Sequence, residues 1–171
     1  MRFLSIGAAC LLLAGCVGAP RGVTVVDGFE LPRYLGTWHE IARLNHAFER
    51  GLSRVTAEYS LRDDGGVRVV NRGFDAERGV WRQAEGKAYF IGSPAVGSLK
   101  VSFFGPFYGG YHILALDRAG YGYSLVAGPS RDYLWILARN PRLDPEVLAR
   151  LTAQAKSLGF PVGQLIYPRQ E

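Results

Sequence analysis

The chain is 171 residues long, which is enough for one ordinary domain and too short for two. Hydrophobic residues make up 48% of it and charged residues 20%, a composition that excludes a disordered or fibrous chain. The formal net charge is +5, but acidic and basic residues are interleaved without a basic block, which argues against nucleic-acid binding. The mild positive balance favours an anionic membrane surface or an anionic ligand as partner.

The first residues have the pattern of an export signal. Arg2 is followed by an apolar run, residues 3–14, that is too short to span a bilayer. The next residues, Leu13-Ala14-Gly15-Cys16, resemble the lipobox of bacterial lipoproteins, in which the cysteine is acylated and becomes the first residue. We therefore expect a signal peptide over residues 1–15 and lipidation at Cys16, since two or more acyl chains anchor a protein durably. Val17 in place of Asp is similar to lipoproteins sorted to the outer membrane.

Residues 16–28 then form a short lipidated tether, and residues 29–171 form the folded domain. Both cysteines of the chain, Cys10 and Cys16, lie before this domain. The folded body therefore contains no disulfide and is held together by its core alone.

The body begins with short alternating runs separated by turn signals roughly every ten residues, which is typical of an all-β barrel or sandwich. Asp63-Asp64-Gly65-Gly66, for example, predicts a hairpin turn. Eight antiparallel strands are expected, and closing them into an up-and-down barrel leaves no exposed edge. The expected strands are residues 37–44, 55–61, 67–72, 81–91, 99–104, 110–117, 123–127 and 133–139.

The pattern changes to helical spacing after the last strand. Asp144 and Pro145 are typical of a helix start, and Gly159 of a helix end. The apolar stripe between them predicts one α-helix packed on the outside of the barrel. Residues 164–167 are expected to add a short final strand.

Three motifs resemble those of the lipocalin family. Residues 31–43 are similar to the opening of a lipocalin, with the Gly-x-Trp motif at Gly36 and Trp38. Asp117 matches the acidic residue of the second motif, although Arg118 stands where many lipocalins carry an aromatic residue. Arg139 matches the arginine of the third motif. The resemblance is closest to bacterial outer-membrane lipocalins, through residues 48–52, 85–90, 100–111 and 131–137.

This resemblance implies that Arg139 stacks on Trp38 to close the barrel floor, a cation–π contact, and that the interior holds a ligand. Strand alternation from Trp38 gives the side chains that point inward. Their mixture of large and small residues is compatible with either a filled core or a void, and the family resemblance favours a cavity. The predicted ligand-binding residues are Glu40, Ala42, Tyr59, Val69, Ala88, Val101, Phe103, Tyr111, Ile113, Tyr133, Trp135 and Leu137.

An apolar cavity of this kind suits the acyl chain of a fatty acid or lysophospholipid, since each buried methylene contributes about 0.8 kcal/mol. Tyr59, Tyr111 and Tyr133 either donate hydroxyls to the headgroup or fill the core with hydroxyls bonded to neighbours. Cations in the loops and nearby strands (Arg50, Arg54 and Lys100) are candidates for attracting an anionic headgroup.

Glu40 is the one acidic side chain in the inward set, and a buried carboxylate must be paired, hydrogen-bonded or protonated. Three interpretations are open at this point. Glu40 pairs with an inward cation, or it binds a headgroup ammonium, or a bulge in the strand turns it to solvent.

Enzymatic chemistry has little support in the sequence. His39, His46 and His112 have no metal-ligand spacing, and no catalytic cysteine, nucleophile elbow or phosphate loop is present. We expect neither metal nor cofactor, with haem ligation by His46 as a minor alternative. The rival functions are a structural envelope lipoprotein with a filled barrel and, less favoured, a lipocalin-type enzyme. Bacterial relatives make a homodimer compatible with the sequence.

Overall fold

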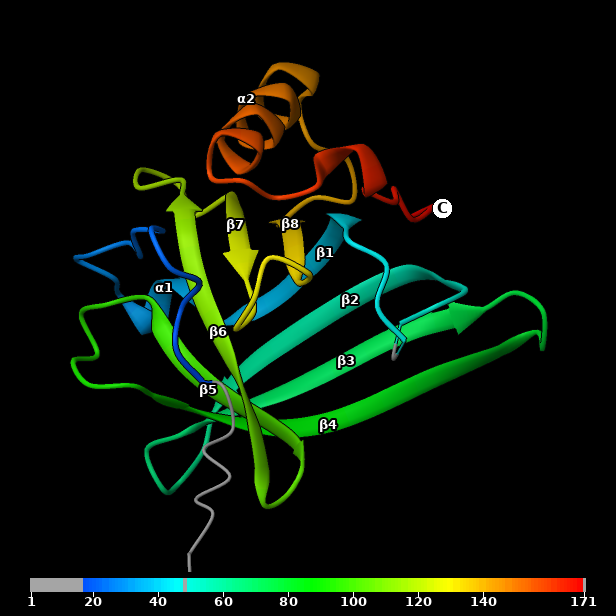
Figure 1. Ribbon diagram of the computed structural model, residues 1–171. Helices are drawn as coiled ribbons and strands as arrows, with labels where there is room; N and C mark the ends of the chain where they lie inside the picture. Colours follow the sequence, from blue (N-terminus) through cyan, green and yellow to red (C-terminus); the bar gives the residue numbers. More distant parts are fainter. Residues whose placement is uncertain (1–16, 48, 171) are drawn as a thin grey trace, which may run out of the picture.

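The computed structural model describes residues 17–47 and 49–170. The lipobox and Cys16 lie outside the described residues, so their prediction is not tested by the structure. Within the described part, eight antiparallel strands form one closed barrel in chain order, β1 to β8, with β8 pairing back to β1 (Figure 1). This confirms the predicted up-and-down barrel. Within this part of the chain, no helix has the length and apolar character needed to cross a membrane.

The strand bounds agree closely with the alternation in the sequence. The strands are β1 (Gly36–Arg43), β2 (Leu52–Leu61), β3 (Val67–Asp75), β4 (Val80–Phe90), β5 (Ser98–Phe104), β6 (Phe107–Leu116), β7 (Tyr123–Ala127) and β8 (Leu134–Ala138). The largest differences are that β2 and β6 begin three residues earlier than expected and β3 ends three residues later, because hairpin pairing extends beyond the alternating apolar core of each strand.

Helix α2 (Pro145–Ser157) covers the outside of the barrel, as predicted. Its N-terminus is capped by the Asp144 carboxylate, which accepts hydrogen bonds from the backbone of Glu146 (2.8 Å) and Val147 (3.3 Å). Leu151 and Ala155 of the helix pack against β1, β7 and β8 in an outer core (Figure 1). The expected final strand over residues 164–167 is wrong: η1 (Val162–Gln164) is a 3₁₀ turn, and Ile166 makes only an isolated bridge to Arg43.

A second core lies inside the barrel. It is built from inward side chains such as Trp38, Val67, Val69 and Ala88, and it is closed at one end by the short helix α1 (Leu31–Tyr34). The barrel wall therefore separates two apolar layers, and only the inner one surrounds the candidate site.

Candidate binding cavity

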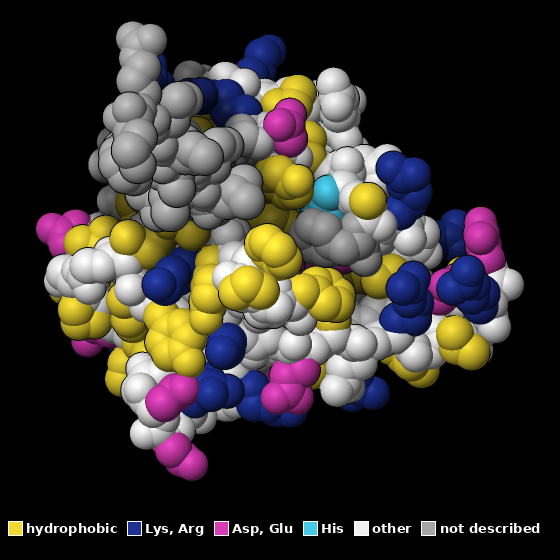
Figure 2. Space-filling view, turned by 60° about the horizontal axis from the view of Figure 1, so that its bottom comes forward, with side chains coloured by type: hydrophobic (Ala, Val, Ile, Leu, Met, Phe, Trp, Pro, Cys, Tyr) yellow, Lys and Arg dark blue, Asp and Glu magenta, His cyan; other side chains and the backbone are white. Residues whose placement is uncertain are grey.

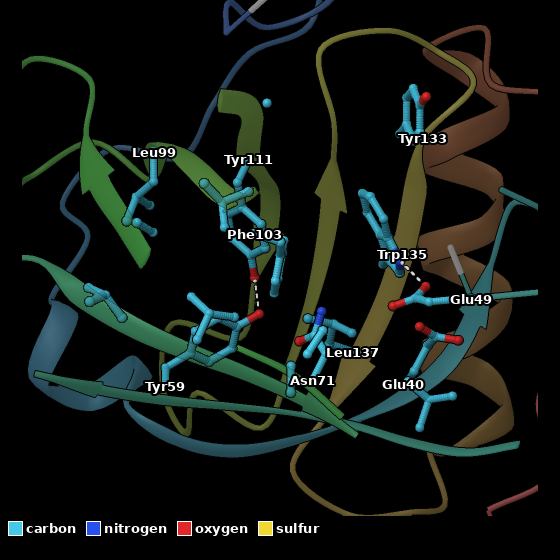
Figure 3. A pocket seen from close by; sticks show the side chains of 18 of the residues that line it. Glu40, Glu49, Tyr59, Asn71, Leu99, Phe103, Tyr111, Tyr133, Trp135 and Leu137 are labelled. Atoms are coloured by element: carbon cyan, nitrogen blue, oxygen red, sulfur yellow. Dashed lines mark hydrogen bonds between the residues drawn. The ribbon is translucent and has the colours of Figure 1, made fainter. Parts of the chain in front are cut away.

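The barrel is hollow. A cavity of about 720 Å³ is lined by residues from every strand except β7, a volume within the range of roughly 300–1,000 Å³ that is usual for small-molecule sites. Its wall is mostly aliphatic and aromatic, with polar side chains gathered at a few places (Figure 3). The open question of a filled or empty interior is thus answered in favour of a cavity.

Most of the inward residues predicted from strand alternation lie on the cavity wall. Leu99, which the alternation also places inside, lines it too. The predicted ligand-binding residues on the wall are Glu40, Tyr59, Val69, Ala88, Val101, Phe103, Tyr111, Tyr133, Trp135 and Leu137. Whether they contact a ligand remains a prediction.

Two predicted residues do not lie on the cavity wall. Ala42 is buried in the outer core beside Leu151 and Ala155, so its predicted inward direction is wrong. The cause is a β-bulge: the pairing of β1 with β8 shifts between Glu40 and Ala42, and the extra residue reverses the alternation beyond it. Ile113 is fully buried in the inner core, but it packs beneath the wall without lining it.

The floor of the cavity contains the three lipocalin-type motifs. The guanidinium of Arg139 lies 4.1 Å from the centre of the Trp38 ring and donates to the carbonyls of Thr37 (3.0 Å) and Arg33 (2.8 Å). Gly36 has a φ of +93°, a backbone conformation that favours glycine, and this brings its chain against Arg139. The predicted stacking of Arg139 on Trp38 is therefore confirmed.

Asp117 lies at this end of the barrel, in the turn between β6 and β7. Its carboxylate accepts backbone hydrogen bonds from Ala119 (3.2 Å) and Gly122 (3.1 Å). Partial burial by itself would raise the pKa of Asp117, but these backbone donors outweigh it and hold the pKa below its ordinary value. The acidic residue of the second motif thus fixes the turn that carries the chain to β7.

A chain of hydroxyl groups lies above the floor. The Tyr111 hydroxyl is 2.9 Å from that of Tyr59 (Figure 3) and 2.8 Å from that of Tyr34. The Tyr34 hydroxyl is also 3.1 Å from Ser124 Oγ. Burial raises the pKa of Tyr34 to about 12 and that of Tyr59 and Tyr111 well above the ordinary value, so all three are neutral. Four hydroxyls share three hydrogen bonds, which leaves one proton for a further acceptor.

Tyr133 belongs to a different part of the wall. Its ring centre lies 6.0 Å from that of His46 and 6.3 Å from that of Trp135. The three tyrosines that were grouped by the sequence are therefore divided: Tyr59 and Tyr111 join the hydroxyl chain, and Tyr133 packs with Trp135 (Figure 3).

A buried group of charged side chains, which we call the acid–base cluster, comprises Glu40, Arg43, His46 and Glu49. Arg43 donates to Glu40 Oε1 at 2.6 Å and to the Glu49 carbonyl at 2.7 Å. Glu49 Oε2 lies 3.1 Å from His46 Nε2 and accepts a hydrogen bond of 3.1 Å from Trp135 Nε1. Of the three interpretations of Glu40, the structure supports pairing with an inward cation.

Burial and neighbouring charge separate the protonation of the two carboxyls. Burial, reinforced by the negative charge of Glu49, raises the pKa of Glu40 well above its ordinary value despite the pairing with Arg43. Burial opposes ionisation of Glu49 too, but hydrogen bonds and charge from His46, with the Trp135 donor, lower its pKa below the ordinary value. Arg43 thus faces one carboxylate, Glu49, and one carboxyl, Glu40, that retains its proton more readily.

Sequence reasoning missed Arg43, Glu49 and Tyr34. Arg43 turns inward because of the β1 bulge, and Glu49 enters the barrel from the connection between β1 and β2, where no periodicity guides assignment. Tyr34 had a weak signal. It precedes Trp38 by four residues, and its carbonyl accepts the indole N–H at 2.8 Å.

The fold, the hollow interior and the Trp38–Arg139 closure together define a lipocalin-type binding barrel. The profile of the Lipocalin-like domain family matches residues 29–170, so the chain belongs to this family.

Particular relatives extend this assignment. Outer membrane lipoprotein Blc of Escherichia coli (strain K12) is 55% identical over 175 residues, covering 99% of this chain and 98% of that protein. Blc of Vibrio cholerae is 50% identical over the full length of both chains. Among solved structures, insecticyanin from the tobacco hornworm superposes with a TM-score of 0.70 at 23% identity, covering 89% of this chain and 86% of that one. That likeness shows the fold alone.

Proposed function

We propose that the protein is a lipid-anchored lipocalin of the bacterial outer membrane that holds a fatty acid or lysophospholipid and does no chemistry on it. The observation that carries the proposal is the hollow, mainly apolar cavity closed at one end by α1 and Trp38. The lipobox-like Leu13-Ala14-Gly15-Cys16 and the relatives named outer membrane lipoprotein support the anchor.

The polar groups of the wall suggest how an amphiphile is oriented. The hydroxyl chain is neutral, and the acid–base cluster already contains its own counter-charge. Arg72 and Arg82, at the other end of the wall, also line the cavity. We infer that the acyl chain points toward the floor and that an anionic carboxylate or phosphate lies near these two arginines.

The proposal is tested by mass spectrometry of an organic extract of the purified protein, followed by titration with palmitate while Trp fluorescence is recorded. Recovery of an unmodified long-chain amphiphile, with palmitate-dependent quenching, is expected. An extract without lipid together with no palmitate response would contradict the carrier function and leave the structural lipoprotein in its place.

A matched pair of variants locates the site. Ala88→Phe adds a phenyl group inside the cavity, and Ala153→Phe adds the same group on the exposed face of α2. Displacing two methylenes weakens binding by about 1.6 kcal/mol, or on the order of tenfold. Only Ala88→Phe should raise the Kd for palmitate. Equal affinities in the two variants would place the ligand outside the barrel.

A further inference from the structure

The segment that follows Cys16 is fixed to the outside of the barrel. The Val17 carbonyl lies 3.0 Å from His112 Nε2 in β6, and a side chain at Gly110 would approach this carbonyl to 2.7 Å. Further along, Val26 donates to the Ile113 carbonyl at 2.8 Å. The sequence predicts a short tether over residues 16–28, and in its described part Val17 and Val26 are hydrogen-bonded to the barrel wall.

His112 provides a defined attachment point for this segment. A carbonyl oxygen only accepts hydrogen bonds, so Nε2 is protonated and donates to the Val17 carbonyl. Nδ1 is then unprotonated and accepts from the Ser98 hydroxyl at 2.8 Å. Burial of the imidazole lowers its pKa, which keeps this neutral tautomer at neutral pH. The exit point of the chain toward Cys16 is therefore held by a specific pair of hydrogen bonds.

Two exposed aromatic rings lie close to this exit point. Phe104 and Phe107 face each other at the tip of the β5–β6 hairpin, and they are 79% and 74% exposed. Gly110, which contacts Val17, is three residues from Phe107, a distance of about 10 Å along a strand. Both phenylalanines also line the cavity, so the hairpin forms part of its rim.

The neighbourhood of the hairpin has the composition of a membrane interface. The ammonium of Lys100 lies 5.1 Å from the centre of the Tyr108 ring, and Tyr89 packs beside Tyr108 with the ring centres 6.5 Å apart. Tyrosine and lysine are suited to the headgroup region of a bilayer, and phenylalanine to its apolar side. Figure 2 shows hydrophobic side chains gathered on this face, with Lys and Arg side chains among them.

We propose that the β5–β6 hairpin inserts Phe104 and Phe107 into the bilayer that holds the acyl chains of Cys16, so that the cavity rim opens onto that membrane. The inference rests on the anchor of the proposed function. Cys16 is joined directly to Val17, so its acyl chains enter the bilayer within a short reach of the hairpin. An amphiphile then passes between bilayer and cavity without crossing bulk water.

The test uses the lipidated protein in vesicles of phosphatidylethanolamine and phosphatidylglycerol that contain lipids brominated on the acyl chain. Phe107→Cys and Tyr167→Cys are each labelled with an environment-sensitive fluorophore, since acylation blocks Cys16 and Cys10 is lost with the signal peptide. Tyr167 is a matched exposed aromatic residue (54% exposed), and it belongs to the C-terminal segment on the opposite side of the barrel (Figure 1). Neither substitution removes a buried side chain.

The fluorophore at residue 107 should be blue-shifted and quenched by the brominated lipids, and that at residue 167 should be unaffected. Adding Phe104→Ser to the Phe107→Cys protein should lower the ratio of docked to undocked barrel on the order of tenfold, because one ring no longer leaves water. Equal quenching at both positions overturns the proposed orientation. A blue shift at residue 107 that appears without vesicles and grows with protein concentration would also overturn the proposal. It would show that a second copy of the chain covers the hairpin.

Failure of the anchor gives a different result. If the protein is washed from the vesicles, lipidation at Cys16 is contradicted, and so is the insertion of the β5–β6 hairpin that depends on it. If the protein stays on the vesicles while residue 107 remains unquenched, only the docking is contradicted. Palmitate binding by the Tyr167→Cys protein, whose substitution lies outside the cavity wall, is measured in parallel, since the carrier function stands or falls independently of either result.

Discussion

The floor and the acid–base cluster each contain an arginine, but the two arginines find their partners in different ways. At the floor, Arg139 gives its hydrogen bonds to backbone carbonyls and its flat face to Trp38, and the residue is only half-buried. In the cluster, Arg43 is almost fully buried. It donates to the Glu49 backbone carbonyl at 2.7 Å, but the groups that balance its charge are side chains: Glu40 at 2.6 Å, and the Glu49 carboxylate 4.0 Å from its Nε.

This difference indicates which of the two regions is more sensitive to substitution. Backbone partners persist through substitution of neighbouring side chains, whereas each buried charge in the cluster is satisfied only while the others remain. We therefore expect substitutions in the cluster to destabilise the protein more than substitutions of equal size at the floor.

The largest effect is expected for Arg43→Met. Removing the cation leaves Glu40 and Glu49 facing each other in a buried site, so the free energy of unfolding should fall by about 3–5 kcal/mol. Urea denaturation measures it. The control is Arg68→Met, which breaks the 2.6 Å ion pair with Glu85 on the surface and should cost at most about 1 kcal/mol. Equal losses in the two variants would show that burial of the cluster is unimportant.

A smaller loss is expected for Arg139→Lys at the floor. Lysine keeps the charge but lacks the planar guanidinium that reaches the carbonyls of Thr37 and Arg33. At roughly 1 kcal/mol for each of these two hydrogen bonds, the free energy of unfolding should fall by about 2 kcal/mol. The same urea experiment reports it. A loss as large as that of Arg43→Met would erase the distinction between the two regions.

Glu40→Gln and Glu49→Gln sharpen the comparison within the cluster. Gln at residue 49 leaves Arg43 without its ionised partner and should cost about 1–3 kcal/mol at neutral pH. Gln at residue 40 replaces a carboxyl whose pKa is raised, so it should cost less. The opposite order of the two losses in urea denaturation would contradict the assigned protonation.

The pH dependence has a definite sign for each carboxyl. Because its pKa is raised in the folded state, Glu40 contributes stability that is fully present below pH 4.5. This stability is lost as the pH rises through the raised pKa. The stability of Glu40→Gln relative to the unsubstituted protein should therefore increase between about pH 4 and about pH 8. Glu49, with its lowered pKa, contributes stability that is present above 4.5 and is lost as the pH falls through the lowered value. Its Gln variant should show the reverse trend.

The smallest effects are expected in the hydroxyl chain. Tyr111→Phe removes the hydroxyl that bonds to both Tyr34 and Tyr59, whereas Tyr59→Phe removes a hydroxyl at the end of the chain. We expect a loss of about 0.5–1.5 kcal/mol for Tyr59→Phe, and a larger one for Tyr111→Phe because it removes two hydrogen bonds instead of one. Thermal unfolding of the two single variants distinguishes them, and identical midpoints would argue against a connected chain.

Local signals in the sequence determined most of the barrel. Strand alternation, the Asp63–Gly66 turn and the capped helix after Asp144 follow from side-chain periodicity and backbone preferences, which act over a few residues. The same signals placed Trp135, Leu137 and Val101 on the cavity wall. Alternation failed beyond Glu40, where the bulge reverses the faces of Ala42 and Arg43.

The eight strands and the outer helix follow from local patterns in the sequence, and the Trp38–Arg139 closure follows from the resemblance of its motifs to those of lipocalins. The hollow interior, the pairing of Glu40 with Arg43 and the position of Val17 beside the β5–β6 hairpin are visible only in the three-dimensional structure. These features depend on how distant side chains share space and charge, and no short-range pattern records that sharing.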